Sequence, residues 1–229
     1  MDYESLLQLV QQRRSIRQFT PDPVPGAYID HIIEAARWAP SGANSQPWQF
    51  VLITHRETQD KIVAFVSDYQ QMMSKIEVAR EPDLRFIAAP SGWVQAPVFI
   101  LVLGDPRTKE QYPLAATLER GQDIFISSLA NAFLYMTLAV TTLGLGGQWV
   151  SFTATAYVQS LLKDLLGIPR GMVIYDMLAV GYPALEPTPR MLRAKETLMH
   201  YERYDRSRYS TDEEVKAYIA AGNRAKEVV

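Results

Sequence analysis

The sequence contains no cysteine, and histidine is nearly as scarce, with three in 229 residues. Without cysteine the chain cannot be a disulfide-stabilised scaffold, a cysteine-ligated metal protein or an enzyme with a thiol nucleophile. His31, His55 and His200 stand apart, and none has a partner at the spacing typical of metal ligands. We therefore expect no metal site.

An excess of either charge is also missing. The chain has 23 Lys and Arg against 25 Asp and Glu, a net charge of −2, and a pI of about 6.0. A nucleic-acid binder usually needs a large basic face, so we expect no nucleic-acid partner. The N-terminus is acidic and polar and lacks the basic start and apolar run of a signal peptide, which predicts a cytoplasmic protein.

One long stretch carries no charge at all, from Ile124 to Leu162. The stretch contains a window of about 20 mostly apolar residues, which is long enough to cross a membrane. However, no basic cluster flanks the stretch, and the glycines of residues 144–147 would break a helix there. We therefore expect a helix ending near Leu143 that is buried in a protein core, and no membrane contact.

Hydrophobic periodicity predicts a single α+β domain over residues 1–229, because no linker, repeat or low-complexity tract divides the chain. Gly167 and Pro169 form a helix stop, and Ser210–Glu213 reads as a capping box that opens a final helix. Helices are expected over residues 3–12, 27–38, 57–79, 114–143 and 157–166, and strands over 48–54, 98–103 and 172–180.

Several catalytic motifs are missing. The chain has no Gly-x-Ser-x-Gly nucleophile elbow, no Walker loop and no carboxylate pair suited to acid–base work. Gly144-x-Gly146-x-x-Trp149 is not a dinucleotide fingerprint, because Trp149 occupies the place of the third glycine and the motif follows a helix instead of a strand.

Two polar motifs are present. Arg13-Arg14-Ser15-x-Arg17 is either a solvated basic turn or an anion cradle, since Arg13, Ser15 and Arg17 point the same way in an extended chain. The second motif lies between two prolines, within residues 39–48. It is either a connector or a stiff loop whose amide groups read a heteroaromatic ring with imide-like edges; its candidate binding residues are Pro40, Ser41, Gly42, Asn44 and Gln46.

Together, and in this order, the motifs resemble the nitroreductase family of FMN-dependent oxidoreductases over most of residues 3–200. The resemblance rests on six segments. They are Arg13-Arg-Ser-Ile-Arg-Gln-Phe19, Ile32-Ile-Glu-Ala-Ala-Arg-Trp-Ala-Pro-Ser41, Asn44-Ser-Gln-Pro-Trp-Gln-Phe50, Ala96-Pro97, Leu143-Gly-Leu-Gly146 and Val180-Gly-Tyr-Pro183.

The resemblance implies residue roles. Arg13 would bind the FMN phosphate, Arg14 and Ser15 the ribityl and ring edge, and Arg17 would lie near flavin N1 and O2. The 40–46 loop would come from the other subunit of a homodimer. Four residues would face the flavin ring after the glycine-rich turn, namely Gln148, Trp149, Val150 and Ser151. A late basic residue would reach the phosphate; spacing leaves both Arg190 and Arg193 open, and we favour Arg193.

The resemblance also implies a central, mostly antiparallel sheet flanked by helices, with an extended C-terminal tail. Residues 55–95 would form a lid, in which Tyr69, Met72 and Met73 either cover the acceptor or simply pack a surface helix. Residues 200–229 would embrace the partner subunit or form a surface helix. An Asn and Lys that some members use before the middle strand are missing from residues 86–92.

The implied reaction passes hydride from NADH or NADPH through the flavin to an electron-poor acceptor (a nitroaromatic, quinone or activated alkene) by a ping-pong sequence. Two alternatives stay open. One is the reductive dehalogenase or flavin-fragmenting branch of the family, although the lid Glu, Tyr and Lys of the deiodinases are not found at matching spacing in residues 55–95. The other is a non-enzymatic flavin-binding protein.

Overall fold

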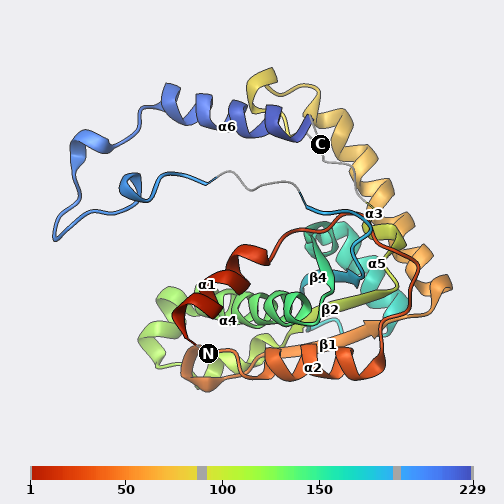
Figure 1. Ribbon diagram of the computed structural model, residues 1–229. Helices are drawn as coiled ribbons and strands as arrows, with labels where there is room; N and C mark the ends of the chain where they lie inside the picture. Colours follow the sequence, from red (N-terminus) through yellow and green to blue (C-terminus); the bar gives the residue numbers. More distant parts are fainter. Residues whose placement is uncertain (1, 87–91, 188–191, 228–229) are drawn as a thin grey trace. The chain divides into compact units, whose positions relative to one another are not determined.

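The computed structural model describes residues 2–86, 92–187 and 192–227 (Figure 1). They fall into two compact units. One contains Met1–Gln70 and Ser91–Glu186, and the other contains Gln71–Pro90 and Pro187–Val229. The first unit holds the sheet and both polar motifs.

The sheet has four antiparallel strands in the order β1-β2-β4-β3. The strands are β1 (Trp48–Ile53), β2 (Val98–Gly104), β3 (Gly146–Val150) and β4 (Val173–Gly181). All seven residues of β2 are buried, because the strand lies in the middle of the sheet with helices on both faces. The expected antiparallel α+β architecture is confirmed.

β3 corrects one expectation, since a glycine-rich turn was predicted where the chain forms an edge strand. Gly146 and Gly147 have low strand propensity, which hides the strand in the sequence. Five residue pairs with β4, from Gly146↔Gly181 to Val150↔Met177, form it nonetheless. Long-range pairing therefore outweighs local propensity here.

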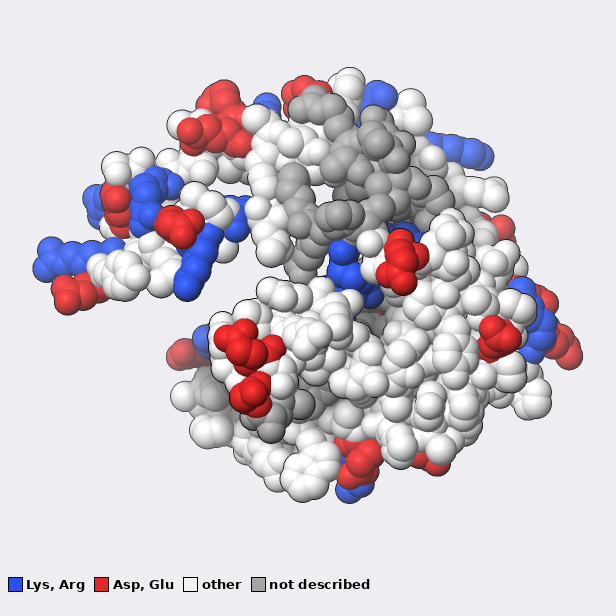
Figure 2. Space-filling view, viewed as in Figure 1, with Lys and Arg blue, Asp and Glu red and all other residues white. Residues whose placement is uncertain are grey.

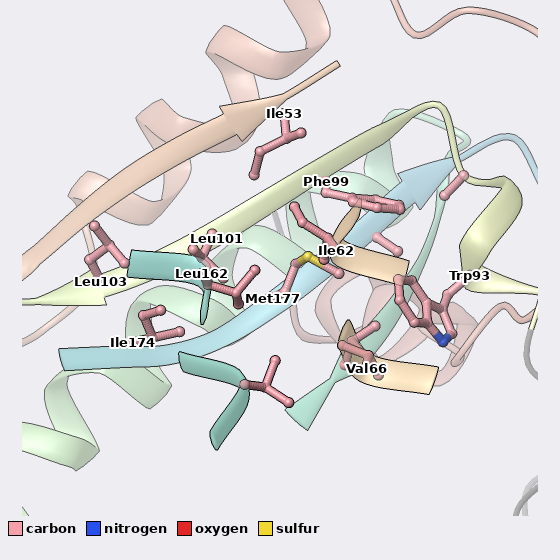
Figure 3. Packing of buried hydrophobic residues seen from close by; sticks show 14 of the residues in the cluster. Ile53, Ile62, Val66, Trp93, Phe99, Leu101, Leu103, Leu162, Ile174 and Met177 are labelled. Carbon is pink, nitrogen blue, oxygen red and sulfur yellow. The ribbon is translucent and has the colours of Figure 1, made fainter. Parts of the chain in front are cut away.

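Two hydrophobic clusters fill the faces of the sheet, and the alternation of β2 divides its side chains between them. Phe99, Leu101 and Leu103 face the cluster under α3 and α5, which Figure 3 shows from close by. Val98, Ile100 and Val102 face α2 and α4. The helices are α1 (Tyr3–Gln12), α2 (Gly26–Arg37), α3 (Arg56–Glu77), α4 (Leu114–Thr142) and α5 (Ala156–Leu166).

The uncharged stretch begins within α4 and continues through β3. Among the described residues, α4 is the one helix long and apolar enough to cross a membrane. Six of its eight buried residues belong to the hydrophobic cluster on this face of the sheet, as the helical core expectation requires. The opposite side of the helix, with Leu134 and Tyr135, is exposed in the single chain, and its burial against a second subunit stays a prediction.

The structure confirms the predicted end of one helix and shifts the predicted start of another. Gly167 ends α5 in the left-handed conformation at φ 64°, as expected. The capping box of the last helix, α6 (Asp212–Glu227), lies one residue later than predicted. The Glu214 amide donates to the Thr211 hydroxyl at 3.2 Å, and the Thr211 amide donates to the Glu214 carboxylate at 2.8 Å.

The second unit joins α6 to the turn that follows α3. α6 packs on the short helical turn Pro82–Leu84. Asn223 donates from its amide nitrogen to the Arg85 carbonyl at 2.8 Å and is buried, and Lys216 pairs with Glu81 at 3.7 Å. The end of the predicted lid and the C-terminal tail therefore contact each other, which the sequence does not indicate.

Candidate functional site

The Arg13–Arg17 motif is held beside β3. α1 ends at Gln12, and Arg13 turns the chain into an extended conformation. The Ile16 amide then donates to the Gly147 carbonyl at 3.0 Å, and Ser15 pairs with Gly147 as a parallel bridge. Ile16 is buried whereas Ser15 and Arg17 are exposed, which agrees with the expectation that the polar side chains share one side of an extended stretch.

Two glycines allow this close approach. A Cβ added to Gly146 would lie 2.5 Å from the side chain of Ile16. On the other side, the Gly92 amide donates to the Arg17 carbonyl at 2.6 Å, and a Cβ on Gly92 would lie 2.2 Å from that oxygen. The backbone of the motif is therefore fixed between two segments that tolerate no side chain.

The end of β3 lies next to the same motif. Gln148 is half-buried and Val150 is buried in the core, while Ser151 is exposed where the strand ends. Trp149 is 45 % exposed and packs on Phe133 of α4, with ring centroids 4.1 Å apart and ring planes tilted by 30°. The structure thus brings the segment 148–151 to the same sheet edge as the motif.

The 40–46 loop is anchored on α4 instead. The Gly42 amide donates to the Ser128 hydroxyl at 3.1 Å, and Asn131 donates to the Pro40 carbonyl at 3.0 Å. Within the loop, the Gln46 amide donates to the Ser41 hydroxyl at 3.0 Å. A cavity of about 210 Å³ opens beside it, lined by Pro40, Ser41, Gly42, Arg120, Ile124, Ser127, Ser128 and Asn131.

Three residues of this loop have positive φ angles, namely Ala43 at 49°, Asn44 at 53° and Gln46 at 41°. Asn visits this region readily, but for Ala it costs about 1–2 kcal/mol. Such strain is retained where the surrounding contacts fix it, and it is concentrated at binding sites. Whether the loop only connects α2 and β1 or also binds a ring stays a prediction.

The two motifs lie at opposite corners of the sheet. The loop enters β1 at Trp48, which pairs with Gly104, whereas Gly147 pairs with Val180, which pairs with Val98 at the other end of β2. Six residue steps along β2 span about 20 Å, and three strand spacings add about 14 Å sideways. One flavin ring cannot touch both segments of the same chain.

α4 gives the same separation independently. The loop bonds Ser128, whereas a Cβ on Gly147 would lie 3.7 Å from Val140. Twelve residues of helix between these contacts span about 18 Å.

One buried acid lies at the end of β3 and was missed by the sequence reasoning. Asp176 on β4 is 8 % exposed and accepts a hydrogen bond of 2.6 Å from the Trp149 indole nitrogen. Burial raises the pKa of its carboxyl from 3.8 to about 6, against the effect of that hydrogen bond. The signal was available, because Asp176 is the one charged residue in the apolar run 172–180.

The remaining candidates contribute less to this geometry. Arg190 lies outside the described residues, and Arg193 is exposed in the second unit. Tyr69 packs on the rings of Phe152 and Tyr157, at centroid distances of 5.9 and 6.3 Å, so it helps to join α3 to α5. Over the described ranges, no cluster of His, Asp and Glu has the composition of a metal site.

Known proteins resemble this chain in sequence and in fold. The model of the nitroreductase family matches residues 10–182. A "Putative NADH dehydrogenase/NAD(P)H nitroreductase" of Archaeoglobus fulgidus is 27 % identical over 180 residues, covering 79 % of this chain and 86 % of that protein. Iodotyrosine deiodinase 1 of Rattus norvegicus is 29 % identical over 212 residues, covering 85 % and 68 %. The solved NADPH:FMN oxidoreductase of Vibrio harveyi, complexed with NAD+, has a TM-score of 0.68 at 18 % identity, covering 97 % and 88 %.

Proposed function

The chain belongs to the nitroreductase family, and from this membership we propose that it is an FMN-dependent oxidoreductase. When bound, FMN would supply the redox chemistry, passing hydride from NADH or NADPH to an electron-poor acceptor such as a nitroaromatic, a quinone or an activated alkene. The observation that carries the proposal is the cationic segment fixed against β3 through Ile16 and Gly147.

The residues beside β3 suit FMN chemically. Arg13 would offer a guanidinium fork to the phosphate, Ser15 would add a hydroxyl donor, and Arg14 would lie along the ribityl chain. Arg17 would hold a cation near flavin N1 and O2, where it would favour the negative charge of the reduced ring. The backbone of residues 148–151 would face the ring. That a late basic residue, Arg193 or Arg190, binds the phosphate stays an expectation from the family resemblance.

A homodimer would complete the site, because the 40–46 loop lies too far from Arg13–Arg17 within one chain. An apolar groove of about 550 Å³ supports this, running between α1, α2 and α4. Its lining includes Leu6, Leu9, Tyr135 and Leu138, and charged side chains are sparse on the face that carries α4 (Figure 2). Covering this face would also bury Leu134.

Reductive dehalogenation is the second candidate. It is favoured by the deiodinase relatives, whose matches cover 81–85 % of this chain. A shared flavin site serves both reactions, so the acceptor decides between them. Turnover of a halotyrosine that is faster than reduction of any nitroaromatic or quinone would reverse our order of preference.

The first experiment is anaerobic. Purified protein should take up FMN, show a flavin spectrum and be bleached by NADH or NADPH, and then be reoxidised by an acceptor from a panel. A protein that takes up no FMN would refute the proposal. FMN that is bound but never reduced by either nicotinamide would indicate a non-enzymatic flavin-binding protein.

The phosphate assignment has its own test. Arg13→Gln should weaken FMN binding by about 10- to 100-fold, the effect of removing a charged hydrogen-bond donor, yet leave riboflavin binding unchanged. Arg37→Gln is the matched control, because Arg37 pairs with Glu34 on the surface of α2. Equal losses for FMN and riboflavin would contradict the assignment. The same comparison with Arg190→Gln and Arg193→Gln chooses between those two.

Subunit mixing tests the shared site. Arg13→Gln and Asn44→Asp would each spoil both sites of their own homodimer. Random exchange of the two variants makes heterodimers with one wild-type site, so about a quarter of the sites should bind FMN normally. No recovery after exchange, or a monomer in sedimentation, would contradict the two-subunit site.

A further inference from the structure

Asp176 is a buried carboxylate in an otherwise apolar strand. It is 8 % exposed, and Ile174, Met177 and Leu178 on the same strand are each 2 % exposed or less. Met177 pairs with Val150, the last residue of β3, so Asp176 lies where β3 ends and stops covering β4. Burying an acid at this position is unfavourable unless a partner compensates it.

The partner is the indole of Trp149. Its ring nitrogen donates to the Asp176 carboxylate at 2.6 Å, a short charge-assisted hydrogen bond. The same ring packs on Phe133, with centroids 4.1 Å apart and ring planes tilted by 30°, and its centroid lies 6.1 Å from that of Tyr175. Trp149 is therefore held at its nitrogen and along one face, while 45 % of its surface stays exposed.

Trp149 lies on the strand that pairs with the cationic motif, and its ring contacts lie on the face of the sheet that carries α4. Trp149 lies two residues after Gly147, and the Gly147 carbonyl accepts a hydrogen bond from the Ile16 amide. A half-exposed indole whose orientation is already fixed binds a planar ring at low cost in side-chain entropy.

We propose that Asp176 is a positioning residue, whose carboxylate fixes the Trp149 indole so that its exposed part forms a rigid wall for the flavin ring. This inference rests on the proposed function, since it needs FMN at the end of β3. The carboxylate acts through Trp149 and does not itself touch the flavin.

Three variants separate positioning from charge. Asp176→Asn keeps an acceptor oxygen for the indole and removes the charge, so FMN binding should match that of the wild type. Asp176→Leu removes the acceptor and should weaken FMN binding about three- to tenfold, the usual penalty for ordering one side chain at a binding surface. Trp149→Phe removes the donor and should have an effect of similar size.

Two readouts report on positioning and would not move with general stability. The first is the Trp149 fluorescence, taken as wild type minus Trp149→Phe, which FMN should quench strongly in wild type and Asp176→Asn and less in Asp176→Leu. The second is a double-mutant cycle, in which Asp176→Leu should have no further effect on FMN binding when it is combined with Trp149→Phe.

The chain offers a matched control. The Trp38 indole donates to the Glu34 carboxylate at 3.0 Å on α2, so Glu34→Leu removes the same kind of bond elsewhere and should leave FMN binding unchanged.

The outcomes are distinct. Wild-type protein that takes up no FMN refutes the proposed function and this inference with it. Two results would refute the inference alone, given a wild-type protein that binds FMN. The first is that Asp176→Leu binds FMN as tightly as the wild type. The second is that Asp176→Leu lowers FMN affinity by the same factor in the Trp149→Phe background as in the wild type. If Asp176→Leu does not fold, Trp149→Phe breaks the same hydrogen bond from the donor side, and unchanged FMN binding in that variant also refutes the inference.

Discussion

Asp176→Asn should make the folded chain more stable at neutral pH, although it removes a charge from a hydrogen-bonded pair. Burial raises the pKa of the Asp176 carboxyl from 3.8 to about 6. At about 1.4 kcal/mol per pKa unit, holding this carboxylate ionised in the folded state costs about 3 kcal/mol. Asn keeps an acceptor for Trp149 and carries no such cost.

The direction of the pH dependence follows from proton binding. Between pH 4 and about 6 the folded chain holds a proton on Asp176 that the unfolded chain has lost. The free energy of unfolding therefore falls as pH rises through this window, and above it the destabilising effect of the ionised Asp176 stays constant at its full size. In the variant this term is absent, so its advantage over the wild type should grow from pH 4 to pH 7 by about 3 kcal/mol.

The assay is urea unfolding of the FMN-free protein at one fixed protein concentration, at pH values from 4 to 8. Other groups titrate alike in both proteins, so the difference between the two stability curves isolates Asp176. Asp105→Asn is a control of opposite sign, because its hydrogen bonds with Arg107 lower the pKa of Asp105. A difference for Asp176→Asn that is constant with pH, or that grows toward pH 4, would refute the reasoning.

Three further substitutions test the described contacts. Gly92→Ala should displace the Arg17 carbonyl, which would lie 2.2 Å from the added carbon, and weaken FMN binding in fluorescence titration about tenfold, or about 1.4 kcal/mol. Gly171→Ala, with open space around it, is the control. Equal FMN affinities of the two variants would contradict the role of Gly92 in fixing the Arg17 backbone. Ala43→Gly should raise the melting temperature by relieving about 1 kcal/mol of strain at φ 49°, and a fall would disprove it. Asn223→Ala should speed amide exchange in residues 77–86 about fivefold, since one hydrogen bond contributes about 1 kcal/mol, with β2 as the internal reference; unchanged exchange would argue against a role for α6.

The flavin-site candidates were predicted from the sequence because they are contiguous motifs. Arg13–Arg17 and residues 40–46 each place several polar groups on one short segment, and their roles at a flavin are implied by the resemblance to the nitroreductase family. The sequence could not show that Ile16 bonds Gly147, since 131 residue positions separate these partners. It also could not show that the two motifs lie at opposite corners of the sheet.

Local patterns determined most elements, whereas pairing between distant segments decided the rest. Helices and strands follow from a period of 3.6 or 2, and Gly167 stops α5 by its own backbone freedom, so the sequence alone was sufficient for them. β3 exists because β4 lies beside it, and the acid at position 176 is retained in the core because Trp149 reaches it from another strand. These contacts join groups that are distant in the sequence and meet only in the folded chain. A local sequence pattern therefore does not predict them.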